Sequence, residues 1–179
     1  PSSRILQKII GKQKLTDTAC CSVVPAATKL AKALCPAPFS TLTHANCGID
    51  LRYPKPATIG PDRLANARAA LDEFGGPVLV VDFGTAVTFD IIDGSGAYVG
   101  GVIAPGLSAM TDYLHEKTAL LPAITLKDHR TAIGKTTVQA MQIGAVHGYR
   151  GLVQGLIKEI RQSLGTKKLS VIATGGCAR

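Results

Sequence analysis

Residues 77–107 read PVLVVDFGTAVTFDIIDGSGAYVGGVIAPGL and make up the most strongly β-forming stretch of the chain. Val78–Val81, Val87–Ile92 and Tyr98–Ala104 are apolar runs rich in β-branched residues, which is the pattern of buried strands. A turn that contains glycine, and that is too short to begin a helix, separates each run from the next. The stretch therefore predicts an antiparallel meander of three strands.

The first turn of this meander carries polar groups suited to a phosphate or a cation. Asp82 ends the first run, Gly84 gives the backbone freedom, and Thr85 adds a hydroxyl. Backbone N–H groups in such a turn can bind phosphate oxygens, and a carboxylate beside them can hold a cation directly or through water. The same residues also suit an ordinary hairpin in which Asp82 accepts hydrogen bonds from the turn. The turn alone leaves both interpretations open.

The composition is that of a folded protein with anionic partners. The chain has 179 residues, 46% of them hydrophobic and 18% charged, which is enough to bury a core in one domain or two small ones. A formal net charge of +8 favours nucleotides, phosphates or nucleic acid as partners. Aromatic residues make up only 4% of the chain, so platforms for stacking bases are sparse and nucleic acid is the least favoured of the three.

Cysteine usage and hydropathy indicate a cytoplasmic protein. The five cysteines form an odd set without C-x-x-C spacing, which fits neither a disulfide framework nor a zinc site. No apolar run approaches the length of a membrane span. The first residues lack the apolar core of a signal peptide. We therefore expect reduced thiols, a cytoplasmic location and no membrane partner.

The chain before the meander predicts helices and weaker strands. The expected elements are helices at Arg4–Ile10, Pro25–Leu34 and Pro61–Phe74, a strand at Thr18–Val24, and a weak strand or irregular segment at Thr41–Tyr53. Proline suits the first turn of the second and third helices. Gly75-Gly76-Pro77 is the best linker candidate, so we expect one domain at residues 1–76 and another at residues 77–179.

After the meander, the sequence predicts two helices and a last strand. The expected elements are a helix at Gly106–Thr118, an extended segment at Leu120–Leu126, a polar loop at Lys127–Lys135, a helix from Thr136 or Thr137 to about Leu164, and a strand at Val171–Thr174. The long helix carries glycines at 144, 148, 151 and 155. Each costs roughly 1 kcal/mol against alanine. We therefore expect another backbone to approach this helix closely, from the same fold or across a dimer.

Two motifs that would indicate other chemistry are incomplete. Gly134-Lys135-Thr136 resembles the end of a P-loop, but His129 stands where the first glycine is required. His115-Glu116 resembles the start of a zinc-protease motif, but Ala119 stands where the second histidine belongs. The four histidines are scattered and lack the spacing of metal ligands. The sequence therefore predicts neither a P-loop nor a zinc site.

Five motifs, in their order along the chain, resemble one family. The motifs are Tyr53-x-x-Pro56-x-x-Ile59-Gly60-Pro61-Asp62-Arg63, Asp82-Phe83-Gly84-Thr85-Ala86-x-Thr88-Phe89-Asp90, Gly100-Gly101-Val102-Ile103-Ala104-Pro105-Gly106-Leu107, Ile133-Gly134-Lys135-Thr136-Thr137 and Thr174-Gly175-Gly176. Their order and spacing closely resemble the type III pantothenate kinases over nearly the whole chain. The resemblance implies an α/β protein with a ribonuclease-H-like (actin-like ATPase) fold in two related domains.

The resemblance also implies roles for individual residues. Asp62 matches the proposed catalytic base, which faces the pantothenate hydroxyl, and Asp82 matches the ligand of a monovalent cation, potassium or ammonium. The other matches are pantothenate contacts at Tyr53, Gly60, Pro61, Arg63 and Thr137, and ATP contacts at Gly84, Thr85, Gly175 and Gly176. Arginine chemistry agrees, because the planar guanidinium of Arg63 can bind the pantothenate carboxylate in a two-pronged way. Pro61 replaces the alanine usual in the family, and proline suits this helical position.

The function implied by the resemblance is ATP-dependent phosphorylation of pantothenate to 4'-phosphopantothenate, the first step of coenzyme A biosynthesis. The implied cofactors are ATP with Mg²⁺ and a potassium or ammonium ion. The implied assembly is a homodimer with a shared pantothenate site. Family members open with a D-x-G-N-T phosphate loop, and no segment of this sequence matches it. We therefore expect the N-terminal domain to be incomplete in this chain, or the chain to diverge from the family there.

Two alternatives follow from these observations. The unmatched phosphate loop suits a catalytically impaired, kinase-like regulatory or accessory protein of the same family. A kinase of the same superfamily that acts on a sugar is the other alternative. Tyr53 with Arg63 argues against the sugar, because an arginine anchor suits a carboxylate.

Overall fold

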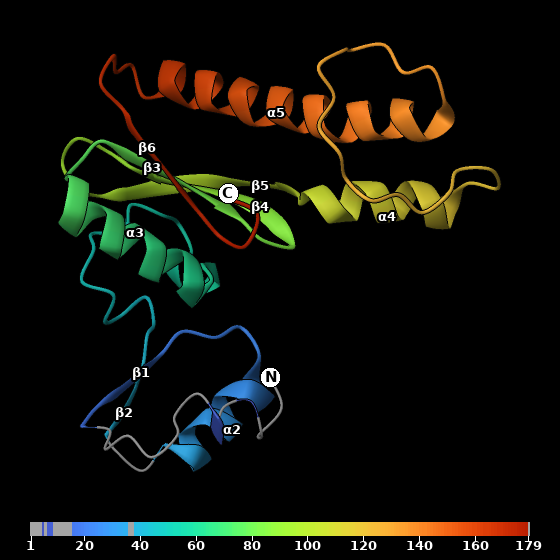
Figure 1. Ribbon diagram of the computed structural model, residues 1–179. Helices are drawn as coiled ribbons and strands as arrows, with labels where there is room; N and C mark the ends of the chain where they lie inside the picture. The colour runs from blue at the N-terminus through green and yellow to red at the C-terminus, as the bar shows by residue number, and fades with distance from the viewer. Residues whose placement is uncertain (1–4, 6, 9–15, 36–37, 179) are drawn as a thin grey trace.

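The computed structural model of the protein describes residues 5, 7–8, 16–35 and 38–178 (Figure 1). The helix expected at Arg4–Ile10 lies mostly outside these residues. The described chain has a mixed α/β architecture, as predicted. In the described part of the chain, no helix is both long and apolar enough to cross a membrane.

The centre of the fold is a four-stranded sheet built from the meander and the last strand. In spatial order its strands are β5 (Tyr98–Pro105), β4 (Ala86–Ile92), β3 (Val78–Phe83) and β6 (Ser170–Thr174). β4 pairs antiparallel with both β3 and β5, which confirms the predicted meander. β6 pairs parallel to β3, so the carboxyl ends of these two strands lie at the same edge of the sheet.

Two helices cover the two faces of this sheet. Helix α3 (Pro61–Phe74) packs in one hydrophobic cluster with Val80 of β3. Helix α5 (Thr137–Ser163) packs in a second cluster with Val81. Successive residues of a strand point to opposite faces, so the apolar run of β3 contributes to both clusters. Figure 1 shows the resulting layers, with the sheet between α3 and α5.

The principal helices begin and end close to the predicted residues. Helix α2 spans Pro25–Leu34, and α3 begins at Pro61 and ends before Gly75. Gly75 has φ 68°, a left-handed conformation that favours glycine after a helix. Thr136 caps α5, because its hydroxyl oxygen accepts a hydrogen bond from the backbone N–H of Gln139 at 3.2 Å.

The first described elements form a small parallel pair of strands. β1 (Thr18–Cys20) pairs with β2 (Phe39–Thr41), and α2 lies between them in the sequence. The strand expected at Thr18–Val24 is therefore shorter than predicted. The chain turns where the hydroxyl oxygen of Ser22 accepts a hydrogen bond from the Val24 N–H at 3.1 Å, and Val24 already caps α2. A 3₁₀ turn, η1 (Pro56–Thr58), then precedes α3.

The first half of α5 extends beyond the sheet together with helix α4 (Leu107–Lys117) (Figure 1). A mainly apolar cavity of about 760 Å³ lies between the two helices. Leu114 lines this cavity and is 38% exposed. Leu107 and Met110 pack on the cluster beneath α5, and Met110 also lines the cavity.

The glycine stripe of α5, at 144, 148, 151 and 155, is exposed along its length. A Cβ atom built at any of these four positions would meet no heavy atom within 4 Å, the helix's own nearby backbone aside. Within the described residues, therefore, no element of this chain packs closely against the stripe. Of the two expectations for these glycines, close packing inside the fold is not supported by the structure.

Candidate active site

Polar side chains of the sheet gather on the face that α3 covers. Asp82 of β3 pairs in register with Thr88 of β4, and Asp90 follows two residues later, so all three side chains leave the same face. Ile103 of β5 pairs with Thr88 and is 63% exposed. The face is therefore accessible to solvent beside Thr88, while α3 covers its other half.

Asp90 is a fully buried carboxylate that three side chains from three elements contact. The Nε–H of Arg63 donates a hydrogen bond to Oδ1 at 2.8 Å, and Nη2 of Arg63 lies 2.7 Å from the same oxygen. The Tyr98 hydroxyl donates to Oδ1 at 2.8 Å, and the Thr88 hydroxyl donates to Oδ2 at 3.3 Å. The Arg63 side chain is 15% exposed, so the cluster reaches solvent through Arg63 rather than through Asp90.

Burial and charge act against each other in this cluster. Burial raises the pKa of the Asp90 carboxyl, and Arg63, Tyr98 and Thr88 act in the opposite direction. Burial alone would lower the pKa of Arg63, but the charge of Asp90 and the hydrogen bond to it outweigh that effect and raise it. Burial, together with the charge of Asp90, also raises the pKa of Tyr98. Because Oδ1 accepts from several donors, the cluster binds the ionised carboxylate, with Arg63 as the cation and Tyr98 as a neutral donor.

Tyr53 lies beside this cluster. Its ring packs edge-to-face on Tyr98, with 6.3 Å between centroids and 71° between planes. The segment that carries Tyr53 is attached to β5 by the backbone: the Tyr98 N–H donates to the Asp50 carbonyl at 2.8 Å, and the Arg52 N–H donates to the Tyr98 carbonyl at 3.0 Å. Two residues predicted as pantothenate contacts, Tyr53 and Arg63, are thus near each other although they come from different elements.

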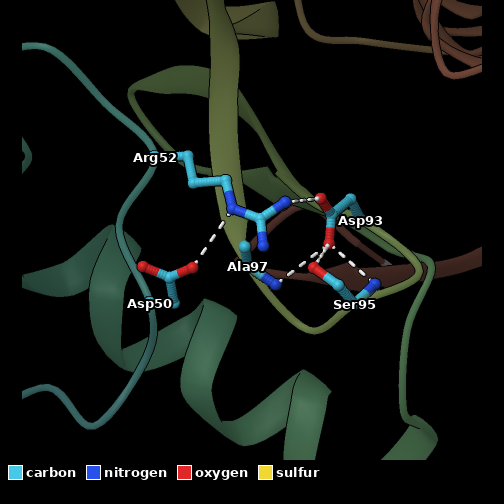
Figure 2. A network of polar contacts seen from close by, with 5 residues as sticks. All are labelled: Asp50, Arg52, Asp93, Ser95 and Ala97. Atoms are coloured by element: carbon cyan, nitrogen blue, oxygen red, sulfur yellow. Dashed lines mark hydrogen bonds and ion pairs between the residues drawn. The ribbon is translucent and has the colours of Figure 1, made fainter.

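A surface network reinforces this attachment. Figure 2 shows the Arg52 guanidinium between Asp50 and Asp93, at 3.1 Å from each carboxylate. Asp93 also accepts hydrogen bonds from Ser95 and from the Ala97 N–H within the β4–β5 turn. The Ser95 hydrogen bond is the main cause that lowers the pKa of Asp93. Exposed ion pairs contribute little free energy, so the network matters chiefly for where it holds the chain before Tyr53.

A second polar cluster lies at the carboxyl ends of β3 and β6. The side-chain amide of Asn66, on α3, donates a hydrogen bond to Oδ2 of Asp82 at 2.8 Å. Oδ1 of Asp82 lies against Gly175, where a Cβ atom would overlap with it and would lie 2.6 Å from the Phe83 nitrogen. The Cys177 N–H donates to the Phe83 carbonyl at 3.2 Å, so the turn after β6 lies directly on the turn after β3.

If the turn at Gly175 contacts ATP, as the family resemblance implies, replacing Gly175 with alanine is expected to raise the KM for ATP in the complete protein about tenfold or more. Gly175 has φ 94°, and the added methyl group would press on Asp82 and on the backbone of β3. Steady-state kinetics with ATP as the varied substrate measure the effect. Gly165→Ala is the matched control, because Gly165 has φ 62° but open space around its Cβ position. An equal KM in the two variants would contradict the prediction.

The predicted site residues lie in three places. Around the start of α3 are Tyr53, Gly60, Pro61, Asp62 and Arg63; at the ends of β3 and β6 are Asp82, Gly84, Thr85, Gly175 and Gly176; and Thr137 lines the cavity between α4 and α5. Asp62 is exposed in the first turn of α3, and its carboxylate lies where a side chain on Gly60 would be. Asn66 lies one helical turn after Arg63 and donates a hydrogen bond to Asp82, so it connects the start of α3 to the ends of β3 and β6. Thr137 is the first residue of α5, and Figure 1 shows this helix on the other side of the sheet from α3, with its start beyond the sheet beside α4.

Sequence reasoning assigned no role to Asp90, Tyr98 or Asn66, although Asp90 ends the second motif. Asp90 had a detectable signal, because a carboxylate inside the buried run of β4 requires a buried partner. Tyr98 and Asn66 had none, since a tyrosine at the start of a strand and an asparagine in a helix are compatible with many surroundings.

The family model described as "Type III pantothenate kinase" matches residues 2–159 of the chain. The chain belongs to the type III pantothenate kinase family. Relatives carrying that name are 56% identical over 133 residues in Methylacidiphilum infernorum, 46% over 178 residues in Akkermansia muciniphila and 46% over 162 residues in Acidiphilium cryptum. These matches cover 74%, 99% and 88% of this chain, respectively.

The type III pantothenate kinase relatives are longer than this chain. The matches cover 49%, 73% and 60% of the three relatives in the same order, so the chain spans between about half and three quarters of their length. A crystal structure described as a Baf family transcriptional activator from Campylobacter jejuni is similar in fold. It has a TM-score of 0.57 and 22% sequence identity, and the match covers 93% of this chain and 69% of that one.

Proposed function

We propose that the complete protein transfers the γ-phosphoryl group of ATP to the hydroxyl of pantothenate, as the first step of coenzyme A biosynthesis. Family membership supports this proposal, and one structural observation carries it. Helix α3 contacts both polar clusters, through Arg63 to Asp90 and, one turn later, through Asn66 to Asp82. An acceptor substrate at the start of α3 and a nucleotide at the ends of β3 and β6 would therefore be neighbours.

The roles of the chain's residues follow from what phosphoryl transfer requires, which is positioning and charge stabilisation. Asp62 accepts the proton of the attacking hydroxyl as the new P–O bond forms and ADP leaves. Arg63 binds the carboxylate of pantothenate, and Tyr53 packs against the substrate. Backbone N–H groups of the turns at 83–85 and 175–176 hold phosphate oxygens.

The residues near Asp82 fit a monovalent cation better than a multivalent metal cluster. Among the described residues, no group of three or more histidine, cysteine or acidic side chains is arranged to hold a metal. Asp82 has one oxygen bonded to Asn66, and the other lies against Gly175. We propose that the Asp82 carboxylate holds potassium or ammonium, while Mg²⁺ arrives with ATP. When bound, these ions offset the negative charge of the phosphates.

The proposed assembly is a homodimer in which a second copy covers the α4–α5 face. Three observations support it: the apolar cavity between the two helices, the exposed glycine stripe of α5, and the place of α5, which begins at Thr137, on the other side of the sheet from α3. If Thr137 contacts pantothenate, it does so in a site that a neighbouring copy completes. A symmetric dimer satisfies this requirement twice.

Gly148→Leu is expected to shift the complete protein toward monomer and to lower its turnover in parallel. Within one chain the leucine meets open space, so only a partner can clash with it. The change should itself favour the helix by about 1 kcal/mol. Light scattering and activity at matched concentrations measure both effects. Gln154→Leu, which adds the same side chain at an exposed position of α5 outside the stripe, is the control. A dimer with normal turnover in Gly148→Leu would contradict the prediction.

The proposed activity is tested on the complete protein with ATP, Mg²⁺, potassium and pantothenate. We expect ADP release that depends on pantothenate, and a product heavier than pantothenate by one phosphate group in mass spectrometry. ADP release that is equal with and without pantothenate would refute the proposal. The likeness to the Campylobacter structure concerns the fold alone, and the named relatives do not support the regulatory alternative that the unmatched phosphate loop left open.

The finer points of the fold and location belong to the same proposal. We propose a ribonuclease-H-like fold in two related domains, with a boundary between residues 1–76 and 77–179. Helix α3 shares a hydrophobic cluster with β3 across that boundary, so the two parts would pack closely. A cytoplasmic location agrees with five cysteines that are all free thiols.

A further inference from the structure

We propose that Asp90, Tyr98 and Gly101 form a slot that fixes the orientation of the Arg63 side chain. These three residues are therefore positioning residues, which act on the acceptor substrate through Arg63. The substrate part of this inference rests on the proposed function. The slot itself is visible in the contacts of the described residues. This role of the slot explains why the Arg63–Asp90 ion pair is buried at a position that apolar side chains could otherwise fill.

The slot uses one edge of the guanidinium and leaves another free. Nε and Nη2 of Arg63 both contact Oδ1 of Asp90, at 2.8 and 2.7 Å. Among the described residues, Nη1 has neither a hydrogen bond nor an ion pair. An arginine has a second pair of donors at its end, formed by Nη1 and Nη2, which matches a carboxylate. Asp90 therefore binds the edge of the guanidinium formed by Nε and Nη2. The edge formed by Nη1 and Nη2 remains for an anionic group of the substrate.

The strand opposite Asp90 makes room for this arrangement. Gly101 of β5 is the register partner of Asp90. A Cβ atom at Gly101 would overlap with Nη2 of Arg63 and with the Phe89 carbonyl oxygen. The guanidinium thus occupies the space above Gly101. The position of Arg63 depends on a missing side chain on β5 as much as on the carboxylate on β4.

Tyr98 is the third residue of the slot. Its hydroxyl donates to Oδ1, the same oxygen that Arg63 contacts, and its ring packs on Tyr53. Tyr98 is fully buried, so its hydroxyl has no competing water. The chain from Tyr53 through Tyr98 and Asp90 to Arg63 therefore fixes the two residues assigned to pantothenate relative to each other.

The test is a double-mutant cycle on the complete protein. Asp90→Asn and Arg63→Lys are each expected to raise the KM for pantothenate about tenfold, with the KM for ATP changed less than about twofold. The double variant should be no worse than the poorer single variant, because both changes remove one interaction. Effects that multiply, or an unchanged KM for pantothenate in Asp90→Asn, would overturn the proposal.

A matched control lies on the same helix. Arg68 pairs with Asp72 on α3, with a 2.8 Å hydrogen bond from Nε, but this pair is largely exposed. Arg68→Lys and Asp72→Asn repeat the chemistry of the two test variants outside the slot, and both should leave the KM for pantothenate unchanged. Tyr98→Phe replaces Asp90→Asn as the test variant if Asp90→Asn does not fold. It keeps the ring and removes the hydroxyl, and it should raise the KM for pantothenate about threefold. No change in Tyr98→Phe would count against the slot.

A second readout needs no substrate. The Nε–H signal of Arg63 in a nitrogen-15 NMR spectrum can be assigned by its loss in Arg63→Lys. We expect slow hydrogen exchange of this signal in the wild-type protein and exchange at least about tenfold faster in Asp90→Asn. Equal exchange rates would overturn the slot. A wild-type protein that lacks pantothenate kinase activity but shows this difference would refute the proposed function and support the slot.

Discussion

Asp62→Asn in the complete protein is expected to lower kcat by roughly 10²–10⁴ while leaving the fold intact, which is the usual contribution of a positioned proton acceptor. Asp62 lies in the first turn of α3 and is exposed, so asparagine fits the same space. Asparagine retains the shape of the side chain but accepts no proton. The KM for pantothenate should change far less than kcat, because the substitution leaves the proposed pantothenate contacts of Arg63 and Tyr53 in place.

The measurement is steady-state turnover with both substrates saturating, accompanied by thermal unfolding of each variant. Asp72→Asn is the control, because Asp72 lies on α3 three turns away from the start and outside both clusters. A turnover in Asp62→Asn equal to that of the wild type would remove Asp62 from the mechanism. A fall in turnover that merely follows a lower unfolding temperature would do the same.

Asp82→Ala is expected to abolish the response of activity to potassium and ammonium and to lower the rate in potassium by about 10² or more, since charge stabilisation by a bound ion is worth several kcal/mol. In the wild type, activity should rise with potassium or ammonium and stay low in sodium. The substitution removes the carboxylate beside Gly175, and it leaves Asn66 without its acceptor.

Initial rates in matched chloride salts of the three ions test this prediction. Asp72→Ala is a suitable control, because Asp72 is an exposed acid that pairs with Arg68 on the same helix, outside both polar clusters. A response to potassium that survives in Asp82→Ala would place the ion elsewhere. Equal wild-type rates in all three salts would mean that no such site exists.

Much of the fold follows from local patterns. The runs at 78–81 and 87–92 and the turns between them predict the meander, because each strand pairs with its neighbour in sequence. Proline at position 61 and glycine at position 75 mark the two ends of α3. The strand expected at Thr18–Val24 is the exception, since the cap of the next helix begins inside it.

The site was harder to predict from the sequence than the fold, because its contacts join residues that are distant in the sequence. Arg63 lies 27 positions from Asp90, and a local pattern says nothing of such a pairing. The sequence predicted a two-pronged contact of Arg63 with the pantothenate carboxylate, and no pattern in it indicated that one edge of the guanidinium pairs with Asp90. Asp90 was identifiable only as a buried acid in need of a partner, and the identity of that partner depends on how α3 docks on the sheet.

The parallel pairing of β6 with β3 has a consequence for how the protein is made. β3 is an inner strand, and one of its edges is covered by β4, which follows it directly. Its other edge pairs with Ser170–Thr174, which the ribosome synthesises only after α4 and α5. Until then, the nascent chain presents an apolar strand with unpaired backbone groups, which is a template for pairing with other chains. β6 therefore covers this edge of the sheet only after α4 and α5 have been synthesised.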